Sequence, residues 1–113
     1  MGSQAFAQES QDTYSQKALL KNWALSRCLA QVYTDESSKN DANATASAYL
    51  EQGRQPITAY EELSALVEKY AKRTYEGSIK SDFNTMKCID LLNSKELESK
   101  TLALTSHHHH KNR

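Results

Sequence analysis

The chain has 113 residues, with 14 basic and 14 acidic side chains and a formal net charge of zero, which is the size of one small domain. The charge balance argues against nucleic acid as a partner, because nucleic-acid binders usually carry a basic surplus on one face, and against membrane binding through basic charge. The content of 3 Gly and 1 Pro favours helices, and no stretch approaches the roughly 18 apolar residues of a membrane span.

The N-terminal stretch MGSQAFAQES has two interpretations. Residues 1–3 are typical of an expression scar, and Ala5-Phe6-Ala7 has the spacing of small residues at which bacterial signal peptidases cut. On this interpretation residues 1–7 are a scar and a signal-peptide remnant, and the mature, exported protein begins near Gln8. The alternative is a chance match in a polar lead-in.

A first helix is predicted over residues 14–33, with Thr13 as its cap and Gln16 completing a capping box. Its apolar residues, which include Trp23 and Cys28, cover most of its circumference. Such a helix is either enclosed by other helices or buried on a second side by a partner.

A second helix is predicted between the acidic break at residues 34–37 and Gln52. Its centre, residues 42–48, has only small side chains, which let helices approach closely. Gly53 is a good residue to follow a helix C-terminus, and Pro56 prevents continuation.

The third predicted helix, about residues 57–76, has the clearest helical periodicity. Pro56 suits its first turn. One side carries apolar residues such as Leu63 and Val67, and the other is charged. Gly77-Ser78 ends this helix, and a loop follows to Ser81.

A fourth helix is predicted from Asp82 to about Leu92, and Ser94 resembles the cap of a fifth that runs to about Leu104. We therefore expect an all-α fold, a compact single-domain bundle of four to five helices over residues 8–105. Residues 106–113, with the run His107–His110, are expected to be a flexible tail or tag and not a closed metal site.

The body of the sequence lacks the combinations of residues that the common catalytic mechanisms need. All four histidines lie in the tail, so a Ser or Cys nucleophile in the body has no histidine base. Two cysteines without histidines cannot make a four-ligand zinc site, and three scattered glycines cannot form a phosphate loop. The Glu61-Glu62 pair on a polar helix face is expected to be solvated surface. We expect no enzyme, no metal and no cofactor.

The two cysteines, Cys28 and Cys88, each lie among apolar residues of a predicted helix. They are either buried free thiols, as in many cytosolic cores, or one disulfide in an oxidising compartment. The even count and the cleavage-like start favour the disulfide, which would close a loop of about 60 residues and contribute about 4 kcal/mol.

Three stretches carry a family resemblance: LKNWALSRCLAQVY (20–33), YLEQGRQPITAYEELSALVEKY (49–70) and NTMKCIDLLNSKEL (84–97). Together they resemble the type VI secretion amidase immunity proteins of the fourth family, over residues 18–97. The Cys of the first stretch and the Cys-Ile-Asp-Leu run of the last are the most specific parts. The His-rich tail does not belong to the family pattern.

The resemblance implies a periplasmic, all-helical homodimer with a disulfide that pairs Cys28 with Cys88. It also implies a protein partner, a papain-like cysteine peptidase that sister cells inject and that cuts peptidoglycan stems. The immunity protein would bind this amidase effector and block its groove, as a 2:2 complex.

We place the effector contact, as a hypothesis, on the polar face of the third helix and in the following loop, although a charged helix face is usually plain solvated surface. Mixed charge with an aromatic residue can steer and anchor an interface. The loop at residues 77–81 would enter the amidase groove. The predicted contact residues are Glu61, Glu62, Glu68, Lys72, Arg73, Tyr75, Gly77 and Ser78.

Two rival functions remain open. One is a periplasmic structural or chaperone-like helical dimer with no enzyme partner, and the other is a cytosolic regulator with free thiols. A disulfide argues against the regulator, whereas only a binding test separates the dimer from the inhibitor.

Overall fold

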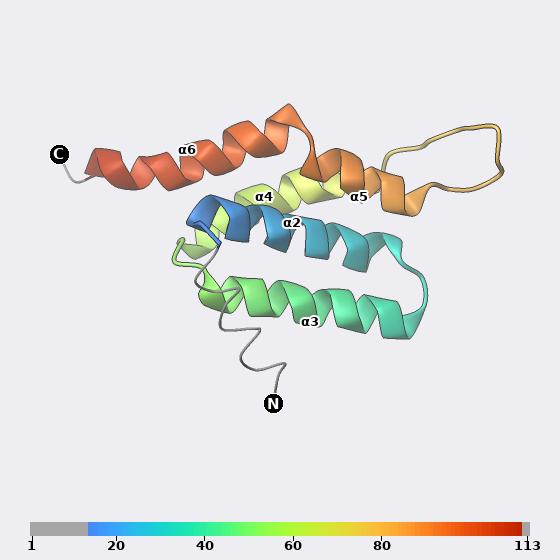
Figure 1. Ribbon diagram of the computed structural model, residues 1–113, viewed down its shortest axis with the longest axis horizontal. Coiled ribbons are helices and arrows are strands. Elements are labelled where there is room, and N and C mark those ends of the chain that lie inside the picture. The colour runs from blue at the N-terminus through green and yellow to red at the C-terminus, as the bar shows by residue number, and fades with distance from the viewer. Residues whose placement is uncertain (1–13, 112–113) are drawn as a thin grey trace.

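The computed structural model describes residues 14–111, with side chains described for residues 14–106. This part of the chain contains five helices and no strand (Figure 1): α2 Gln16–Val32, α3 Glu36–Gln52, α4 Ile57–Ala71, α5 Asn84–Leu92 and α6 Lys95–Lys111. The predicted all-α bundle is therefore confirmed. Residues 1–7 and Thr13 lie outside the described residues, and the predicted division of the chain at residues 7 and 105 stays a prediction.

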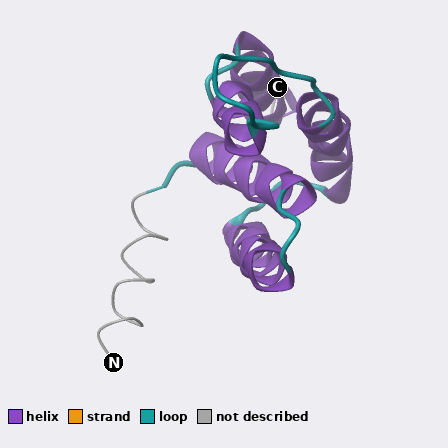
Figure 2. Cartoon of the chain, turned by 90° about the vertical axis from the view of Figure 1, so that its right-hand side faces the viewer, coloured by secondary structure: helices purple, strands orange, loops and turns teal. Residues whose placement is uncertain are grey.

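Helix α2 is the centre of the bundle, because it packs against each of the other four helices. Helix α3 lies on one side of it, and α4, α5 and α6 lie on the other side (Figures 1 and 2). The side chains of α2 are buried around most of its circumference, including Leu20, Trp23, Cys28 and Val32. Of the two arrangements predicted for this helix, the structure has the one in which neighbouring helices enclose it.

Both ends of α2 are capped by side chains. Ser15, and not the predicted Thr13, is the N-cap: its Oγ accepts a hydrogen bond of 3.1 Å from the backbone N–H of Ala18. At the C-terminus, Nζ of Lys39 in α3 donates to the carbonyl oxygens of Ala30 and Tyr33 at 2.7 and 3.1 Å. The lysine thus satisfies carbonyl groups that a helix end leaves without partners.

Helix α3 begins after the N-cap Asp35, whose carboxylate accepts from the backbone N–H of Ser38 at 3.0 Å and whose pKa is lowered by its hydrogen bonds with that residue. Its buried residues, Ala42 and Ala46, are small, so α3 lies close against α2 as expected. The chain leaves α3 at Gly53 in an extended conformation.

Helix α4 buries Tyr60, Leu63, Val67 and Tyr70 on the predicted face. The helix begins at Ile57 as predicted, and Pro56, predicted in the first turn, is the N-cap directly before it. The predicted end at residue 76 is wrong, because the helix stops at Ala71. Beyond it, the chain turns away and the residues up to 83 form a loop.

Helices α5 and α6 follow the loop. Helix α5 begins at Asn84, after Phe83 in the left-handed conformation with φ of 53°. The predicted cap Ser94 is confirmed, since its Oγ accepts from the N–H of Leu97 at 3.1 Å. Helix α6 continues to Lys111, beyond the predicted end near Leu104, so the backbone of the histidine run is helical. No Gly or Pro follows Leu104 to end it.

The core joins α2 to α4, α5 and α6 through Leu20, Leu63, Leu91 and Leu97, all fully buried. The predicted disulfide is present: Cys28 of α2 and Cys88 of α5 are bonded, with their Cα atoms 5.6 Å apart and no exposed surface on either residue. Because only Cys88 and Leu91 of α5 are buried, the disulfide is a large part of what attaches α5 to the bundle.

Candidate functional site

The predicted contact residues fall into two groups in the structure. Glu61, Glu62 and Glu68 lie on the exposed face of α4, and Lys72 follows directly after its last residue. Arg73, Tyr75, Gly77 and Ser78 belong to the loop, where all but the half-buried Tyr75 are exposed. The two groups are consecutive in the chain and lead from the exposed face of α4 into the loop.

The charges on the α4 face are paired within the chain. Glu68 and Lys72, four residues apart, form an ion pair at 3.9 Å, and Nζ of Lys100 in α6 lies 3.7 Å from Glu62. All four side chains are substantially exposed, and such pairs contribute little to stability. These charged groups are therefore accessible to a partner.

The loop at residues 72–83 stands away from the helices at the end of the bundle (Figure 1). Its first part is held by side chains: the guanidinium of Arg73 lies 3.9 Å from the centre of the Tyr70 ring, and its Nη1 donates to the Tyr75 hydroxyl at 3.3 Å. The hydroxyl of Tyr75 donates in turn to Oδ2 of Asp90 in α5. The hydrogen bond with Tyr75 is the main cause that raises the pKa of Arg73.

The second part of the loop is closed by a close packing contact. A Cβ atom on Gly77 would lie only 2.8 Å from Cζ of Phe83, so the glycine lets the ring approach the backbone. The Oγ of Ser81 accepts from the N–H of Phe83 at 3.0 Å. Between these contacts Ile79 is 73% exposed, more than any other large apolar side chain among the described residues. The loop thus presents an apolar tip on a fixed base.

Glu96 of α6 connects α4 to the C-terminal helix. Its carboxylate accepts from Lys69 Nζ at 2.7 Å and from the hydroxyl of Tyr70 at 2.8 Å. These bonds, with Lys69 first, lower the pKa of Glu96. Tyr70 therefore links Glu96 to the Arg73 guanidinium above its ring, and so to the base of the loop.

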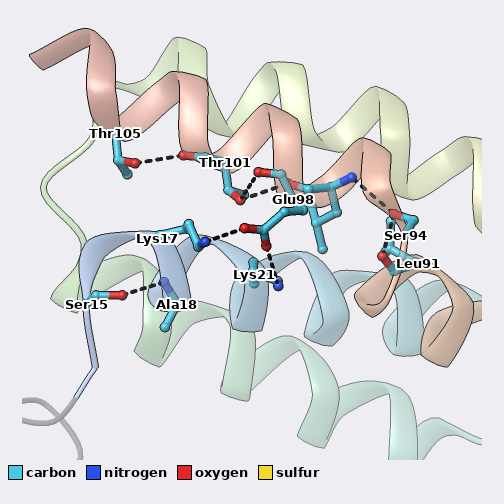
Figure 3. Close-up of polar contacts among 10 residues, drawn as sticks. Ser15, Lys17, Ala18, Lys21, Leu91, Ser94, Glu98, Thr101 and Thr105 are labelled. Carbon is cyan, nitrogen blue, oxygen red and sulfur yellow. Dashed lines mark hydrogen bonds and ion pairs between the residues drawn. The ribbon is translucent and has the colours of Figure 1, made fainter.

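Glu98 attaches α6 to α2 (Figure 3). Its two carboxylate oxygens accept from Nζ of Lys17 and Lys21, the second at 3.0 Å. The hydrogen bonds with Lys17 and then Lys21 lower the pKa of Glu98. Further along α6, the Thr101 hydroxyl donates to the carbonyl of Leu97 at 2.8 Å, so this buried polar group is satisfied.

A groove between α4 and α6 was missed by the sequence-based prediction. It is lined on the α4 side by Glu62, Ala65 and Lys69, and on the α6 side by Lys100 and Ala103. The small residues of its lining are Ala65 on α4 and Ser99 and Ala103 on α6. The sequence analysis did not predict which face of the last helix packs against α4, so it could not predict a groove between them.

A cluster of metal ligands and a membrane-spanning helix are two features that the described residues lack. No three His, Cys, Asp or Glu side chains among them gather closely enough to hold a metal ion. None of the helices within residues 14–111 is long and apolar enough to cross a bilayer.

Comparison with known proteins identifies the family. The sequence model of Tai4, described as the type VI secretion system amidase immunity protein, matches residues 18–101. The chain belongs to this amidase immunity family. The match spans α2 to the middle of α6 and so includes the disulfide, the loop and the α4 face. Among the curated proteins, none gives a significant match.

Solved structures of the Tai4 family share the fold. The chain is 55% identical to a chain of the Tae4/Tai4 effector–immunity system from Salmonella typhimurium, with a TM-score of 0.78 over 81% of this chain and 91% of that one. A chain of the Tae4–Tai4 effector–immunity complex from Enterobacter cloacae is 27% identical, with a TM-score of 0.71 and coverage of 79% and 91%. A Serratia marcescens chain, from work on type VI-secreted toxins and self-resistance proteins, is 35% identical, with a TM-score of 0.68 and coverage of 79% and 73%.

Proposed function

We propose that this immunity protein binds a type VI secreted amidase of the Tae4 kind and inhibits it, and so protects the cell that makes it. The observation that carries this proposal is the 55% identity, over 81% of the chain, to a member of a Tae4/Tai4 effector–immunity system. The enzyme that it blocks would be a cysteine peptidase that cuts peptidoglycan stems. Inhibition by binding needs no catalytic group, and we assign none to this chain.

We place the contact with the amidase on the α4 face and the following loop. Residues 77–81 would enter the groove of the enzyme and exclude its substrate. The exposed Ile79 supports this placement, because an apolar side chain on a projecting loop can fill a pocket of a partner. The exposed charges at Glu61, Glu62 and Glu68 would lie at the rim, where they steer the encounter.

The assembly and location are also proposals. A homodimer that holds two amidases would give a 2:2 complex, in keeping with the prevalence of two-fold symmetry in oligomers. The periplasm is supported by the Cys28–Cys88 disulfide, since disulfides form and persist in oxidising compartments.

The first experiment measures hydrolysis of peptidoglycan stems by the amidase encoded beside this gene, with increasing amounts of the oxidised protein. We expect complete inhibition at one subunit per enzyme. Light scattering after size-exclusion chromatography should give the mass of a 2:2 complex. The amidase from an unrelated secretion cluster is the control for specificity.

Undiminished hydrolysis at a large excess of folded, oxidised protein would contradict the proposal. In that case the structural or chaperone-like dimer would be the leading function. Inhibition accompanied by a 1:1 mass would support the function and contradict only the dimer.

A further inference from the structure

The base of the loop at residues 72–83 is tied to α5 by a chain of polar contacts. Arg73 lies over the Tyr70 ring and donates to the Tyr75 hydroxyl, which donates to the carboxylate of Asp90. A hydroxyl that accepts from a cation and donates to an anion is polarised in both directions, which strengthens both bonds. We call the pair Tyr75 and Asp90 the latch.

The latch shortens the free part of the loop. Without it, the chain between Ala71 and Phe83 would be held only by Arg73 over the Tyr70 ring and by the packing of Gly77 against Phe83. With it, Tyr75 is fixed against α5, and the packing of Gly77 against Phe83 fixes the next two residues. Only the tip around Ile79 then remains to be ordered when a partner binds.

Ordering a loop on binding costs conformational entropy for every residue that becomes fixed. A loop that is already held in its binding shape avoids most of this cost. The latch lies at the base of the segment that carries the exposed Ile79, so it shortens the part of the loop that a partner must order.

We infer that Asp90 is a positioning residue: through Tyr75 it holds the loop at residues 72–83 in the shape in which it meets the amidase. This inference rests on the proposed function. Asp90 lies on α5, outside the predicted contact set, and its carboxylate is engaged by Tyr75, so it acts on the partner through the loop.

The attachment of α5 itself does not depend on the latch. Cys88, bonded to Cys28 of α2, and the fully buried Leu91 fix the helix from the side of the core. Asp90 is only half-buried. Its loss should therefore loosen the loop and leave the helix bundle intact.

The test compares three variants of the full, oxidised chain: Asp90→Ala, Asp90→Asn and Tyr75→Phe. Hydrogen exchange of the amides at residues 76–82 is measured in the free protein, and the affinity for the amidase is measured by calorimetry. We expect Asp90→Ala and Tyr75→Phe to speed exchange and weaken binding by about tenfold each, the factor that about 1.4 kcal/mol for one charge-assisted hydrogen bond gives.

Two further comparisons separate positioning from a general loss of structure. Asp90→Asn keeps an oxygen that accepts from Tyr75 and should retain most of the affinity. Combining Tyr75→Phe with Asp90→Ala should cost no more than Tyr75→Phe alone, because Tyr75→Phe already removes the bond to Asp90 together with the bond from Arg73. Asp41→Ala, on the exposed face of α3, is the control that should change neither measurement.

The outcomes distinguish this inference from the proposed function. Unchanged exchange in Asp90→Ala would overturn the inference, whatever the affinity. Faster exchange with unchanged affinity would also overturn it, and would remove the loop from the interface while inhibition by the unaltered protein still stands. If the unaltered protein does not bind the amidase at all, the proposed function fails, and the inference fails with it.

Discussion

Gly53 has no side chain, and the Tyr60 hydroxyl occupies the space where its Cβ atom would lie. A Cβ atom there would lie 2.2 Å from the hydroxyl oxygen of Tyr60. Tyr60 is 6% exposed, and its ring packs edge-on against Trp23 with 5.1 Å between the ring centroids. The φ of Gly53 is −79°, which any residue adopts, so the glycine is needed for space and not for conformation.

We predict that Gly53→Ala lowers the free energy of unfolding by about 1–3 kcal/mol, because the packed Tyr60 ring must shift. Urea denaturation followed by circular dichroism measures the change. Tyr60→Phe removes the clashing oxygen, and the next atoms are 3.5 and 3.6 Å away, at ordinary contact. In that background Gly53→Ala should cost almost nothing, and an equal cost in both backgrounds would contradict the explanation.

Glu98 should make the stability depend on pH. Its two lysine partners lower its folded-state pKa below the ordinary 4.5, so the folded state favours the ionised carboxylate. The contribution is then fully present above pH 4.5 and is lost as the pH falls through the lower folded-state pKa. We predict that Glu98→Gln destabilises the protein at pH 7 and that the difference from the unaltered chain disappears in acid.

Denaturant midpoints of both proteins at several pH values between 7 and 3 measure this difference. Glu51→Gln is the matched control, because Glu51 is an exposed glutamate on α3 with no ion pair among the described side chains. A Glu98→Gln difference that is the same at pH 7 and pH 3 would exclude the ion pairs as its cause.

At the scale of elements, α5 is the helix most dependent on a single bond. It has nine residues, of which two are buried, and one of these is Cys88. We predict that the double change Cys28→Ala/Cys88→Ala lowers the free energy of unfolding by about 4 kcal/mol, the value expected for a disulfide that closes a loop of this length. Guanidinium titration of the oxidised chain and the variant gives this number.

The reduced, unaltered chain is the control for that experiment, since it loses the bond but keeps both sulfur atoms in the core. Its midpoint should match that of the double variant. If the oxidised chain and the double variant unfold at the same denaturant concentration, the disulfide does not stabilise the fold and α5 is held by its other contacts.

The α4 face should contribute to partner binding through its charge. We predict that Glu62→Lys/Glu68→Lys weakens binding to the amidase by about tenfold, because reversed rim charges repel where they previously attracted. The pairs these residues make within the chain are exposed, so stability should change little. Calorimetry gives the affinity, and thermal unfolding monitors the fold.

Asp41→Lys/Glu51→Lys is the matched control, because it changes the net charge equally and lies on α3, on the opposite side of α2 (Figure 1). An unchanged affinity in Glu62→Lys/Glu68→Lys would remove the α4 face from the interface. An equal loss in the control would show that only net charge matters.

The helices were predictable from sequence because their signals are local. Periodic apolar residues fix the buried face of α4, and side-chain caps such as Asp35 and Ser94 fix where α3 and α6 begin. The end of α4 was not predictable, because the chain beyond it is held by a hydrogen bond between Tyr75 and Asp90, which is fifteen residues away in the sequence. The left-handed Phe83 has no local signal either, since its ring is positioned against Gly77.

The candidate site was partly predictable for the same reason. The sequence places charged residues such as Glu62 and Glu68 on one helix face, and the structure has them there. The pairing of Tyr75 with Asp90 and the link from Tyr70 to Glu96 join separate elements, and no spacing along the chain encodes them. The resemblance to the family supplied the function, which neither composition nor periodicity contains.

At the scale of the whole molecule, the parts divide by task. Helix α2 organises the core, α3 covers one side of it, α4 packs on the other side, and the loop after α4 projects at one end of the bundle (Figure 1). The loop is attached at its base to α5, which the disulfide attaches to α2. The proposed surface is therefore attached to α2 in two ways: α4 packs on it directly, and the loop is joined to it through α5.

The central position of α2 has a consequence for synthesis. This helix is made before the other four described helices, yet Cys28 finds its partner 60 residues later and Lys17 finds Glu98 later still. While the ribosome is still adding α5 and α6, Leu20 and its neighbours have no complete core to enter. The core therefore cannot be completed before the last helix, which supplies Leu97, has been made.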